Sequence, residues 1–576
     1  MAGGLFVLFG LYLHSKLRII ERDPEMHRPV ATEEALAAHC EEIVGEPRIV
    51  EAGERILVAV GYDLANIILI RTDDGNVIVD AGMSVGRAAA AKEALLARSP
   101  GPIRALIYTH SHIDHIGGAA AFVEEGTEIW ATKTFDDHFI KQYGVLREIE
   151  TIRGARQFGS SVEFTSLPCS ALGRRVDLDG SMRPGIRFPT HRFEGKTSFT
   201  IGGLEIQLFE AHGETHDQLF VYIPSLEALF PGDNYYLAFP NLYTIRGTSP
   251  RDVPRWIQSL DRMRRLDPAR LIPSHTLPIE GRGEVRLALR DYRDGIQSIQ
   301  DQVIRYANQG LDLDAIVERL ALPKSLAERR SLLELYGQID WSGRAIFGNA
   351  LGWFDGRPEA LYPSGRVEFA KKTVKNLGGQ ARVLDLAEES RSEGDVRYAL
   401  ELLALLRDAD ALDERGKNAF VSALRELAET IANTNGRAYL LEMALELEGT
   451  HKLPPTPELD ETMLRAIPPS TILEVMKSRL LPERAADVEE SIAIEFIDTG
   501  ARYQLAIRHG ILEIAEGDPL PGSRPPEAIM RVSEREFQEL GLGQKSPAAL
   551  LAAGRLQIEG DALMLRRFFQ RFRRDL

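Results

Sequence analysis

The sequence predicts an α/β sandwich followed by an all-α helical domain and a C-terminal α+β domain. The first observation is a region rich in short β-branched runs, which extends over residues 46–285. The second is a change to helical spacing of Ala, Leu and Glu over residues 286–452. The third is a proline-rich segment at 453–457, after which short alternating strands return. A chain of 576 residues is long enough for several such domains.

The first domain contains two successive groups of predicted strands. The first group covers residues 55–60, 66–70, 76–80 and 103–108, and the second covers 199–201, 205–209, 219–223, 228–230 and 270–272. A stretch rich in Ala, Leu and Lys at 88–97, inside the first group, predicts a helix. Two halves in which strands alternate with helix predict a two-sheet sandwich that is flanked by helices.

The N-terminal segment, residues 1–45, begins with an apolar run from Met1 to Leu13. The run is shorter than the ~20 residues that span a bilayer, has no basic start and is followed by no small-residue cleavage site. A degenerate export signal, an anchor and a wrongly assigned start are alternatives to a short apolar helix without a targeting role. If residues 1–15 act as a signal or anchor, we expect a periplasmic or membrane-anchored protein, and otherwise a cytoplasmic one.

The other two domains have different expected roles. Residues 286–452 predict antiparallel helix pairs, which suit a packing or dimerisation module. Residues 453–576 predict an α+β domain, with a meander of strands at 493–497, 503–508 and 511–514. Membrane association is expected only through the N-terminal apolar run.

The charge balance and the rarer residues limit the possible functions. Lys and Arg number 69 against 85 Asp and Glu, a net charge of −16, which excludes nucleic-acid binding through a basic surface. Cys40 and Cys169 allow at most one disulfide and exclude a cysteine-rich zinc module. Eight of the 13 histidines lie between His110 and His275, so the chemistry is expected in the first half of the chain.

A dense group of potential metal ligands directly follows the predicted strand that ends at Tyr108. The segment reads Thr-His-Ser-His-Ile-Asp-His-Ile-Gly-Gly over residues 109–118. Where the chain leaves the strand, His110 and His112 can reach one cation, and Asp114 and His115 can reach a neighbouring one. Imidazole and carboxylate ligands without thiolate suit zinc, manganese or iron. Chance is a poor explanation of a pattern this specific.

Three further potential ligands lie at the ends of other predicted strands. Glu214 lies just before the strand at 219–223, Asp233 follows the strand at 228–230, and His275 follows the strand at 270–272. Each alone has an ordinary explanation as a turn, cap or surface residue. Their appearance in order at strand ends, after the histidine segment, favours one metal centre.

At this point the chain resembles the metallo-β-lactamase superfamily, whose hallmark is the His-x-His-x-Asp-His motif on an αββα sandwich. The turn Gly213-Glu214-Thr215 carries a carboxylate where the superfamily usually has histidine, which resembles the alkylsulfatase branch. Residues 241–247, 351–358 and 552–561 are similar to segments of the same branch, the last of them in its sterol-carrier-protein-2-like domain. The resemblance covers nearly the whole chain after about residue 45.

The resemblance implies two zinc ions per chain and a residue set that holds them. Metal 1 would be bound by His110, His112 and Glu214. Metal 2 would be bound by Asp114, His115 and His275, with Asp233 bridging both in place of the family's usual glutamate. Asp114 and Asp233 would act in catalysis. His212 and His216 flank Glu214, and either is an alternative third ligand of metal 1.

The implied activity is hydrolysis of an alkyl sulfate ester to an alcohol and inorganic sulfate by zinc-bound hydroxide. Arg246 would hold the sulfate through two donors, with Asn241 and Tyr243 as further substrate-binding residues. A homodimer through the helical domain is the implied assembly. Another hydrolase of the superfamily, such as a lactonase, thioesterase or phosphodiesterase, is the alternative, followed by an iron oxidoreductase and a lipid-binding protein.

Two positions depart from the branch. Trp341 stands where the family has a histidine near the sulfate, and Phe158 stands at a position related to a family tyrosine. A proton donor to the leaving group would then come from His212, from His216, from a tyrosine such as Tyr235 or Tyr243, or from water. The substrate preference is therefore expected to differ from that of the best-known members.

Overall fold

The computed structural model describes residues 25–176, 183–453, 467–541 and 543–573. The chain forms two compact units. The larger comprises residues 1–135, 148–184 and 189–456, and the smaller comprises residues 136–147, 185–188 and 457–576. The apolar run at 1–13 and the signal or anchor proposed there lie outside the described residues. Among the helices that the structure does describe, none combines the length and the apolar character needed to cross a membrane.

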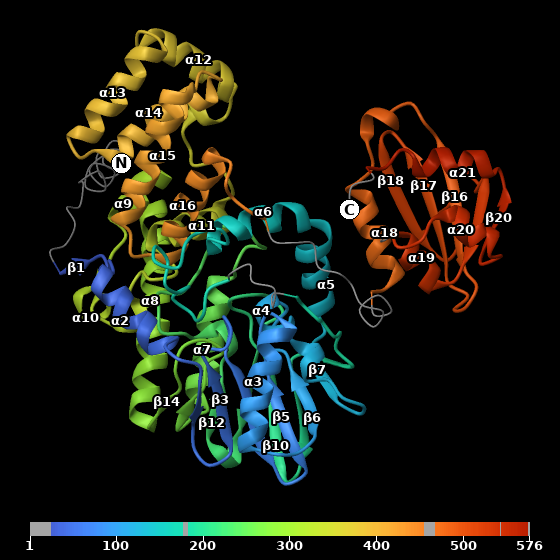
Figure 1. The fold of residues 1–576 in the computed structure, drawn as a ribbon, viewed down its shortest axis with the longest axis horizontal. Helices are drawn as coiled ribbons and strands as arrows, with labels where there is room; N and C mark the ends of the chain where they lie inside the picture. Colours follow the sequence, from blue (N-terminus) through green and yellow to red (C-terminus); the bar gives the residue numbers. More distant parts are fainter. Residues whose placement is uncertain (1–24, 177–182, 454–466, 542, 574–576) are drawn as a thin grey trace, which may run out of the picture. The chain divides into compact units, whose positions relative to one another are not determined.

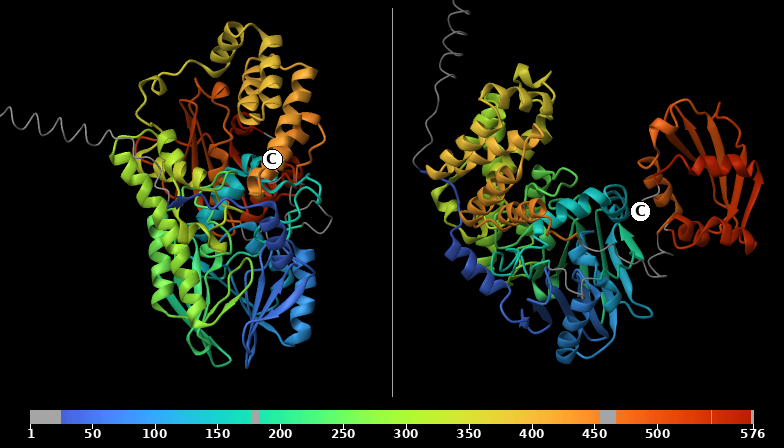
Figure 2. Two further views of the ribbon diagram at one scale, coloured as in Figure 1. Left: turned by 90° about the vertical axis from the view of Figure 1, so that its left-hand side faces the viewer. Right: turned by 45° about the horizontal axis from the view of Figure 1, so that its top comes forward.

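The larger unit contains a sandwich of two β-sheets (Figures 1 and 2). The first sheet has the order β2 (Arg48–Glu51), β3 (Ile56–Val60), β4 (Ile67–Thr72), β5 (Gly75–Val79), β6 (Ile103–Ile107), β7 (Glu128–Thr132) and β8 (His191–Phe193). The second sheet has the order β14 (Ile279–Glu280), β13 (Arg270–Leu271), β12 (Ala228–Phe230), β11 (Leu219–Ile223), β10 (Leu204–Glu210) and β9 (Lys196–Ile201). The two groups of strands predicted from the sequence thus form one sheet each.

The hydrophobic core of the sandwich lies between the sheets. Val58 and Ile70 of the first sheet pack with Ile206 and Val221 of the second, and all four are fully buried. Strands β3 and β4 are apolar on both faces because helix α3 (Val85–Arg98) contacts them on the outside. The structure confirms the predicted helix–sheet–sheet–helix sandwich.

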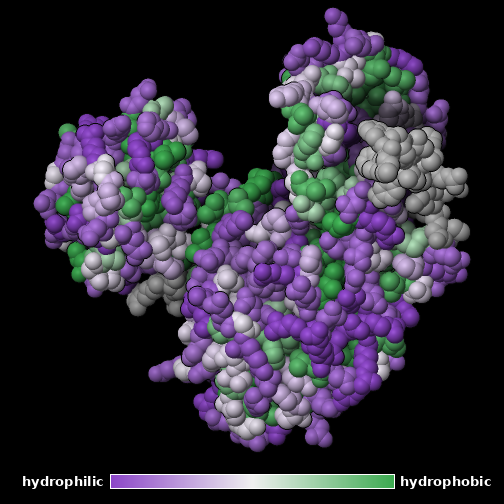
Figure 3. All heavy atoms as spheres, turned by 180° about the vertical axis from the view of Figure 1, so that it is seen from behind, coloured by the Kyte–Doolittle hydropathy of each residue, from purple (hydrophilic) through white to green (hydrophobic). Residues whose placement is uncertain are grey.

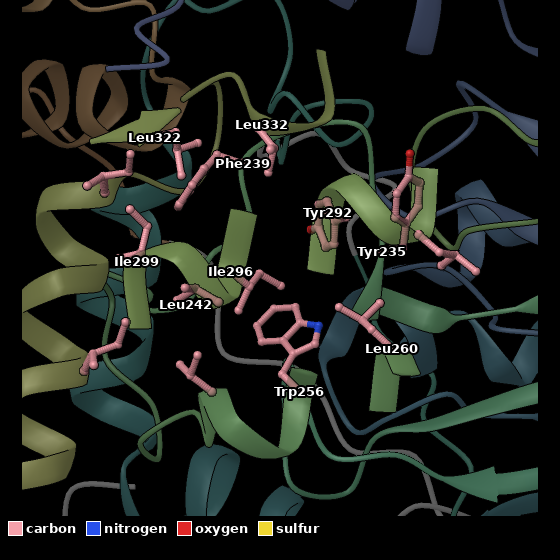
Figure 4. Packing of buried hydrophobic residues seen from close by; sticks show 14 of the residues in the cluster. Tyr235, Phe239, Leu242, Trp256, Leu260, Tyr292, Ile296, Ile299, Leu322 and Leu332 are labelled. Atoms are coloured by element: carbon pink, nitrogen blue, oxygen red, sulfur yellow. The ribbon is translucent and has the colours of Figure 1, made fainter. Parts of the chain in front are cut away.

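Helices α7 (Val253–Arg265) and α8 (Arg282–Asn308) cover the outer face of the second sheet. Figure 4 shows their packing around Trp256, which is fully buried. The indole Nε1 of Trp256 donates a hydrogen bond to the carbonyl of Asn234, 3.1 Å away. Because Asn234 directly follows Asp233, this bond ties α7 to the turn that carries a predicted metal ligand.

The rest of the larger unit is helical. Its main helices are α9 (Leu313–Arg319), α11 (Ile339–Leu351), α12 (Arg366–Asn376), α13 (Gln380–Ser392), α14 (Val396–Asp408), α15 (Glu414–Glu429) and α16 (Thr434–Glu448). Helices α13 and α14 pack together, as do α15 and α16, around one apolar cluster. The predicted helix pairs are therefore present, whereas α8 and α11 pack on each other and extend the core outside the second sheet.

A disulfide bond connects two distant parts of the larger unit. It joins Cys40, in helix α2 (Glu33–Ile43), to Cys169, and 129 positions separate the two cysteines in the sequence. Both sulfurs lie in a buried cluster that also contains Leu36 and Ala171. The two cysteines thus form the single disulfide that the sequence allowed.

The smaller unit contains the C-terminal α+β domain. Its sheet has the order β18 (Ile511–Glu516), β17 (Arg502–Arg508), β16 (Glu490–Phe496), β19 (Ala528–Val532) and β20 (Leu556–Gly560). The helices are α18 (Pro469–Lys477), α19 (Glu534–Gly541), α20 (Pro547–Ala552) and α21 (Ala562–Phe569). The predicted meander is β16 to β18, while β19 pairs in parallel with β16, an arrangement that no local pattern indicated.

Candidate metal centre and active site

The histidine segment lies at the end of β6, where the chain turns into the short helix α4 (Ile113–Ile116). Gly117 and Gly118 end this turn against the backbone of the neighbouring loop. A Cβ on Gly117 would lie 2.0 Å from the carbonyl oxygen of Met83, and one on Gly118 would lie 2.1 Å from that of Ala81. Only glycine fits this close approach, so the two glycines fix the course of the ligand-bearing turn.

Six of the seven predicted metal ligands converge in two groups of three, and in each group the potential ligand atoms lie within 4.8 Å of one another. The first group is His110, His112 and Asp233, and the second group is Asp114, His115 and His275. In the first, Nε2 of His110 lies 2.8 Å from Nδ1 of His112. In the second, Oδ2 of Asp114 lies 3.5 Å from Nε2 of His115 and 3.4 Å from Nε2 of His275.

Asp233 lies between the two groups. It follows β12 in a tight turn whose first residue, Gly232, has a φ of +58°, a conformation that favours glycine. One oxygen, Oδ2, lies 3.9 Å from Nε2 of His110, 3.5 Å from that of His115 and 3.3 Å from that of His275. A single carboxylate oxygen thus faces imidazoles of both groups, the arrangement expected of a bridging ligand.

Asp80, which the sequence analysis did not single out, orients the second group. Its Oδ2 accepts hydrogen bonds from Nδ1 of His115 at 2.8 Å, from Oγ of Ser274 at 2.6 Å and from Oγ1 of Thr109 at 2.9 Å. A carboxylate behind a histidine fixes the ring and leaves the other nitrogen free to bind a metal. Its position directly after β5, which pairs in parallel with β6, is the one feature of the sequence that could have indicated this role.

Buried polar atoms without a hydrogen-bond partner indicate that these residues fit a metal. Among the described residues, buried atoms without a hydrogen-bond partner include Nε2 of His115, Nε2 of His275 and Oδ1 of Asp233. Buried polar atoms are normally paired, and all three atoms belong to the convergent groups. Nitrogen and oxygen donors of this kind are the ligands that a divalent metal takes, so the residues fit a metal centre.

The electrostatics also favour a cation. Burial lowers the pKa of His110 to about 4, and burial holds the pKa of His112 well below its usual value. Both rings are therefore neutral, which is the form that binds metals. Burial also disfavours the charged form of His275, but Asp233 and Asp114 outweigh this and raise its pKa to about 10. The two carboxylates thus create a site that stabilises positive charge.

Glu214, the seventh predicted ligand, is outside both groups. Its two carboxylate oxygens form an ion pair with the guanidinium of Arg251, with N–O distances of 2.5 Å, and both side chains are buried. The backbone N–H of Glu214 donates to Oδ1 of Asn234 at 3.2 Å. Arg251 is a residue that the sequence analysis missed, because no local pattern around it indicates a partner in the turn at Glu214.

The two alternative ligands beside Glu214 bond elsewhere. Nε2 of His212 lies 2.9 Å from a carboxylate oxygen of Glu210. Nε2 of His216 lies 2.8 Å from the carbonyl oxygen of Pro250. Neither histidine belongs to the two convergent groups of the described residues.

Arg246 adjoins the first group. Its side chain is buried, its Nη2 lies 3.1 Å from Nε2 of His112, and its Nη1 is paired with Glu150. Glu150 lies on helix α6 (Arg147–Phe158), whose Gln157 also accepts the backbone N–H of Arg246 at 2.8 Å. A guanidinium this buried differs from one in an ordinary surface ion pair. Arg246 therefore presents positive charge beside the predicted metal ligands.

The other two predicted substrate-binding residues differ in exposure. Asn241 is buried, and among the described residues neither Oδ1 nor Nδ2 of its side chain has a hydrogen-bond partner. Its backbone N–H donates to the hydroxyl of Tyr236 at 2.7 Å. Tyr243 is 37% exposed. A buried amide without a partner is suited to receive a polar ligand.

The remaining predicted positions lie in different surroundings. Trp341 is half-buried in the first turn of α11. Phe158 is half-buried beside the cluster that contains the disulfide. The ring of Tyr235 packs on Tyr292, with 4.8 Å between centroids, and burial raises the pKa of its hydroxyl. Tyr235 thus belongs to the core, which disfavours it as the proton donor to a leaving group.

Family models match three consecutive parts of the chain. The metallo-beta-lactamase superfamily model matches residues 60–275, the alkyl sulfatase dimerisation model residues 312–450, and the alkyl sulfatase C-terminal model residues 458–574. The fold is similar to the solved structure of the stereoselective inverting sec-alkylsulfatase Pisa1 from Pseudomonas sp.. That similarity has a TM-score of 0.86 at 24% identity and covers 98% of this chain and 90% of the other.

Curated relatives match over most of their length. A linear primary-alkylsulfatase of Pseudomonas sp. (strain ATCC 19151) is 30% identical over 525 residues, which cover 87% of this chain and 97% of the relative. An (R)-specific secondary-alkylsulfatase of Pseudomonas sp. is 26% identical over 523 residues, covering 88% of this chain and 78% of the relative. With its convergent ligand groups and its three matching regions, the chain belongs to the alkylsulfatase family, the metal-dependent sulfuric ester hydrolases built on a metallo-β-lactamase domain.

Proposed function

We propose that the protein hydrolyses alkyl sulfate esters to an alcohol and inorganic sulfate, using two zinc ions held by the first and second ligand groups. The observation that carries this proposal is the pair of adjacent groups that share the carboxylate of Asp233. Buried Arg246 beside the first group supports sulfate as the anion that is recognised. The alkylsulfatase relatives support an alkyl group as the part of the substrate to which this sulfate is esterified.

The donor set supports zinc at both positions. Each group offers imidazole nitrogens and carboxylate oxygens without thiolate, and Glu214 is the proposed additional ligand of the first group. When bound, a zinc pair lowers the pKa of water towards ~7, which supplies hydroxide at neutral pH, and it polarises the ester. Asp233 would hold the pair together, and Asp80 would keep the ring of His115 in its binding orientation.

The chain's own residues would bind and orient the substrate. The planar fork of Arg246 can donate to two oxygens of a tetrahedral sulfate. The amide of Asn241, which has no hydrogen-bond partner among the described residues, can donate to a third oxygen, and the hydroxyl of the partly exposed Tyr243 can contact the ester or its leaving oxygen. Asp114, whose Oδ2 faces His115 and His275, and Asp233 are the proposed catalytic carboxylates.

Metal content and sulfate release together test this function. We expect two zinc ions per chain by elemental analysis and release of inorganic sulfate from a medium-chain alkyl sulfate. A chelator should abolish the release, and added zinc should restore it, because the proposed hydrolysis depends on hydroxide supplied by bound zinc. Two metals without sulfate release, combined with hydrolysis of a lactone, thioester or phosphodiester, would favour another hydrolase of the superfamily.

We also propose that the protein is a homodimer through its helical domain. Large apolar side chains of residues 351–369 are solvent-exposed, among them Trp353 at 76% and Tyr362 at 92%. They lie within the part that matches the dimerisation model, residues 312–450, and Figure 3 shows hydrophobic residues at the surface of the helical region. Exposed apolar patches are typical of interaction surfaces.

Light scattering checks the dimer. We expect a mass of about twice the 64.1 kDa of one chain for the wild type, and a shift towards one chain for the double variant Trp353→Ser and Tyr362→Ser. Leu563→Ser is the matched control, because Leu563 is 68% exposed but lies in the C-terminal domain. An unchanged mass for the double variant would place the interface elsewhere.

A further inference from the structure

Arg251 connects Glu214, the proposed additional ligand of the first metal, to Asn241, a proposed substrate-binding residue. It lies in the loop before α7, and its guanidinium pairs with both carboxylate oxygens of Glu214. The same guanidinium donates to the backbone carbonyl of Asn241. The side chains of Arg251 and Glu214 are 2% and 5% exposed, so the pair is shielded from water.

The surroundings of Arg251 are held on several sides. Nδ2 of Asn349, on helix α11, donates to the backbone carbonyl of Arg251 at 3.1 Å. The backbone N–H of Glu214 is bound to Asn234, and that of Asn241 to Tyr236. Two separate turns therefore meet at the guanidinium of Arg251, while helix α11 holds its backbone. The side chain of Arg251 therefore cannot move without disturbing both Glu214 and Asn241.

We propose that Arg251 is a positioning residue that aims Glu214 at the first metal and fixes Asn241 for the sulfate. This role rests on the proposed function, because it takes Glu214 as a ligand of the first metal. A carboxylate that binds a metal is commonly oriented by a hydrogen-bond donor behind it. A buried carboxylate without a partner is costly, so loss of Arg251 would let Glu214 turn away or take up a proton.

The shape of the guanidinium is part of the role. Two parallel N–H donors hold both oxygens of Glu214 in one plane, and a further donor reaches the carbonyl of Asn241. Lysine supplies the charge from a single point and cannot make this set of bonds. The variant Arg251→Lys therefore separates the geometry of the contact from its charge.

The first test is zinc binding to the metal-free full-length chain, measured by competition with a chromophoric chelator. We expect Arg251→Met to weaken the binding of one of the two zinc ions by roughly 10- to 100-fold and to leave the other nearly unchanged. Arg251→Lys should recover only part of the loss. Arg255→Met is the matched control, because Arg255 lies on α7, is 57% exposed and pairs with Asp252. Unchanged zinc affinity in Arg251→Met would overturn the proposal.

A double-mutant cycle tests whether Arg251 acts through Glu214. The variant Glu214→Gln should lose affinity for the same zinc ion, and adding Arg251→Met should cause no further loss. The double variant also leaves no buried unpaired charge, which keeps the test valid if Arg251→Met alone fails to fold. Additive losses in the double variant would overturn an effect through Glu214.

Steady-state kinetics test the second part of the proposal, that Arg251 fixes Asn241 for the sulfate. With zinc at saturating concentration, Arg251→Met should raise KM for an alkyl sulfate more than it lowers kcat, because Asn241 loses its anchor. A fall in kcat with unchanged KM would contradict this. If the wild type binds two zinc ions but releases no sulfate, the proposed function fails, and the zinc titration still decides whether Arg251 positions Glu214.

Discussion

Replacement of Asp233 by asparagine is expected to reduce kcat/KM for an alkyl sulfate by at least about 10³-fold, equivalent to about 4 kcal/mol. Oδ2 of Asp233 faces imidazoles of both ligand groups at 3.3 to 3.9 Å, so one substitution affects both metal positions. The amide keeps the volume of the side chain but removes its negative charge and offers a weaker ligand. Zinc per chain should fall below two, as measured by elemental analysis alongside the rate of sulfate release.

The matched control for this substitution is Asp267→Asn. Asp267 pairs with Arg282 and Arg286 at the protein surface, so its loss should change neither zinc content nor rate beyond experimental scatter. Circular dichroism spectra of both variants should match that of the wild type. An Asp233→Asn variant that keeps two zinc ions and the wild-type rate would remove Asp233 from the metal centre.

Replacement of Arg246 by alanine is expected to reduce kcat/KM by about 10²- to 10³-fold while the zinc content stays at two. The guanidinium lies beside His112 but belongs to neither ligand group, so its loss removes an anion contact and leaves the metal ligands in place. This result differs from that of Asp233→Asn, in which metal and activity are lost together. Steady-state kinetics and elemental analysis on the same preparation distinguish the two.

Arg246→Ala also removes the guanidinium that pairs with the half-buried carboxylate of Glu150, which can itself disturb the structure. The double variant Glu150→Gln and Arg246→Ala also removes the negative charge of Glu150 and should show the same loss of activity. Arg264→Ala is the control, since Arg264 forms an ion pair with Asp261 on the solvent side of α7. Full activity of Arg246→Ala towards sulfate esters would exclude Arg246 as the sulfate contact.

The convergence of the predicted ligands could be expected because residues that directly follow neighbouring strands lie at the same edge of the sandwich. His110 and His112 follow one strand, and Asp233 and His275 follow others, so their approach requires only that the two sheets pack as predicted. The direction of Glu214 was not predictable in the same way. Its side chain lies in a turn, and its orientation depends on Arg251, 37 positions further along the chain.

The residues that the sequence analysis missed share one property. Asp80, Glu150 and Arg251 act on residues that lie 35, 96 and 37 positions away in the sequence. Their roles come from packing between elements, which leaves no periodic pattern in the chain. Asp80 is the partial exception, because its place at the end of a strand beside β6 could have indicated it. Local patterns thus predicted the residues that converge better than the residues that orient them.

The disulfide between Cys40 and Cys169 encloses the histidine segment in a covalent ring. The 129-position span between the two cysteines contains β2 to β7 and four predicted ligands, His110 to His115. A cross-link over so long a span restricts the unfolded chain by about 5 kcal/mol in the chain-entropy account. The ring would persist in the metal-free chain, so it would keep the predicted ligand segment close to the arrangement that a bound metal needs. Reduction of this bond would therefore make reassembly of the two ligand groups depend more heavily on the metal that they are proposed to bind.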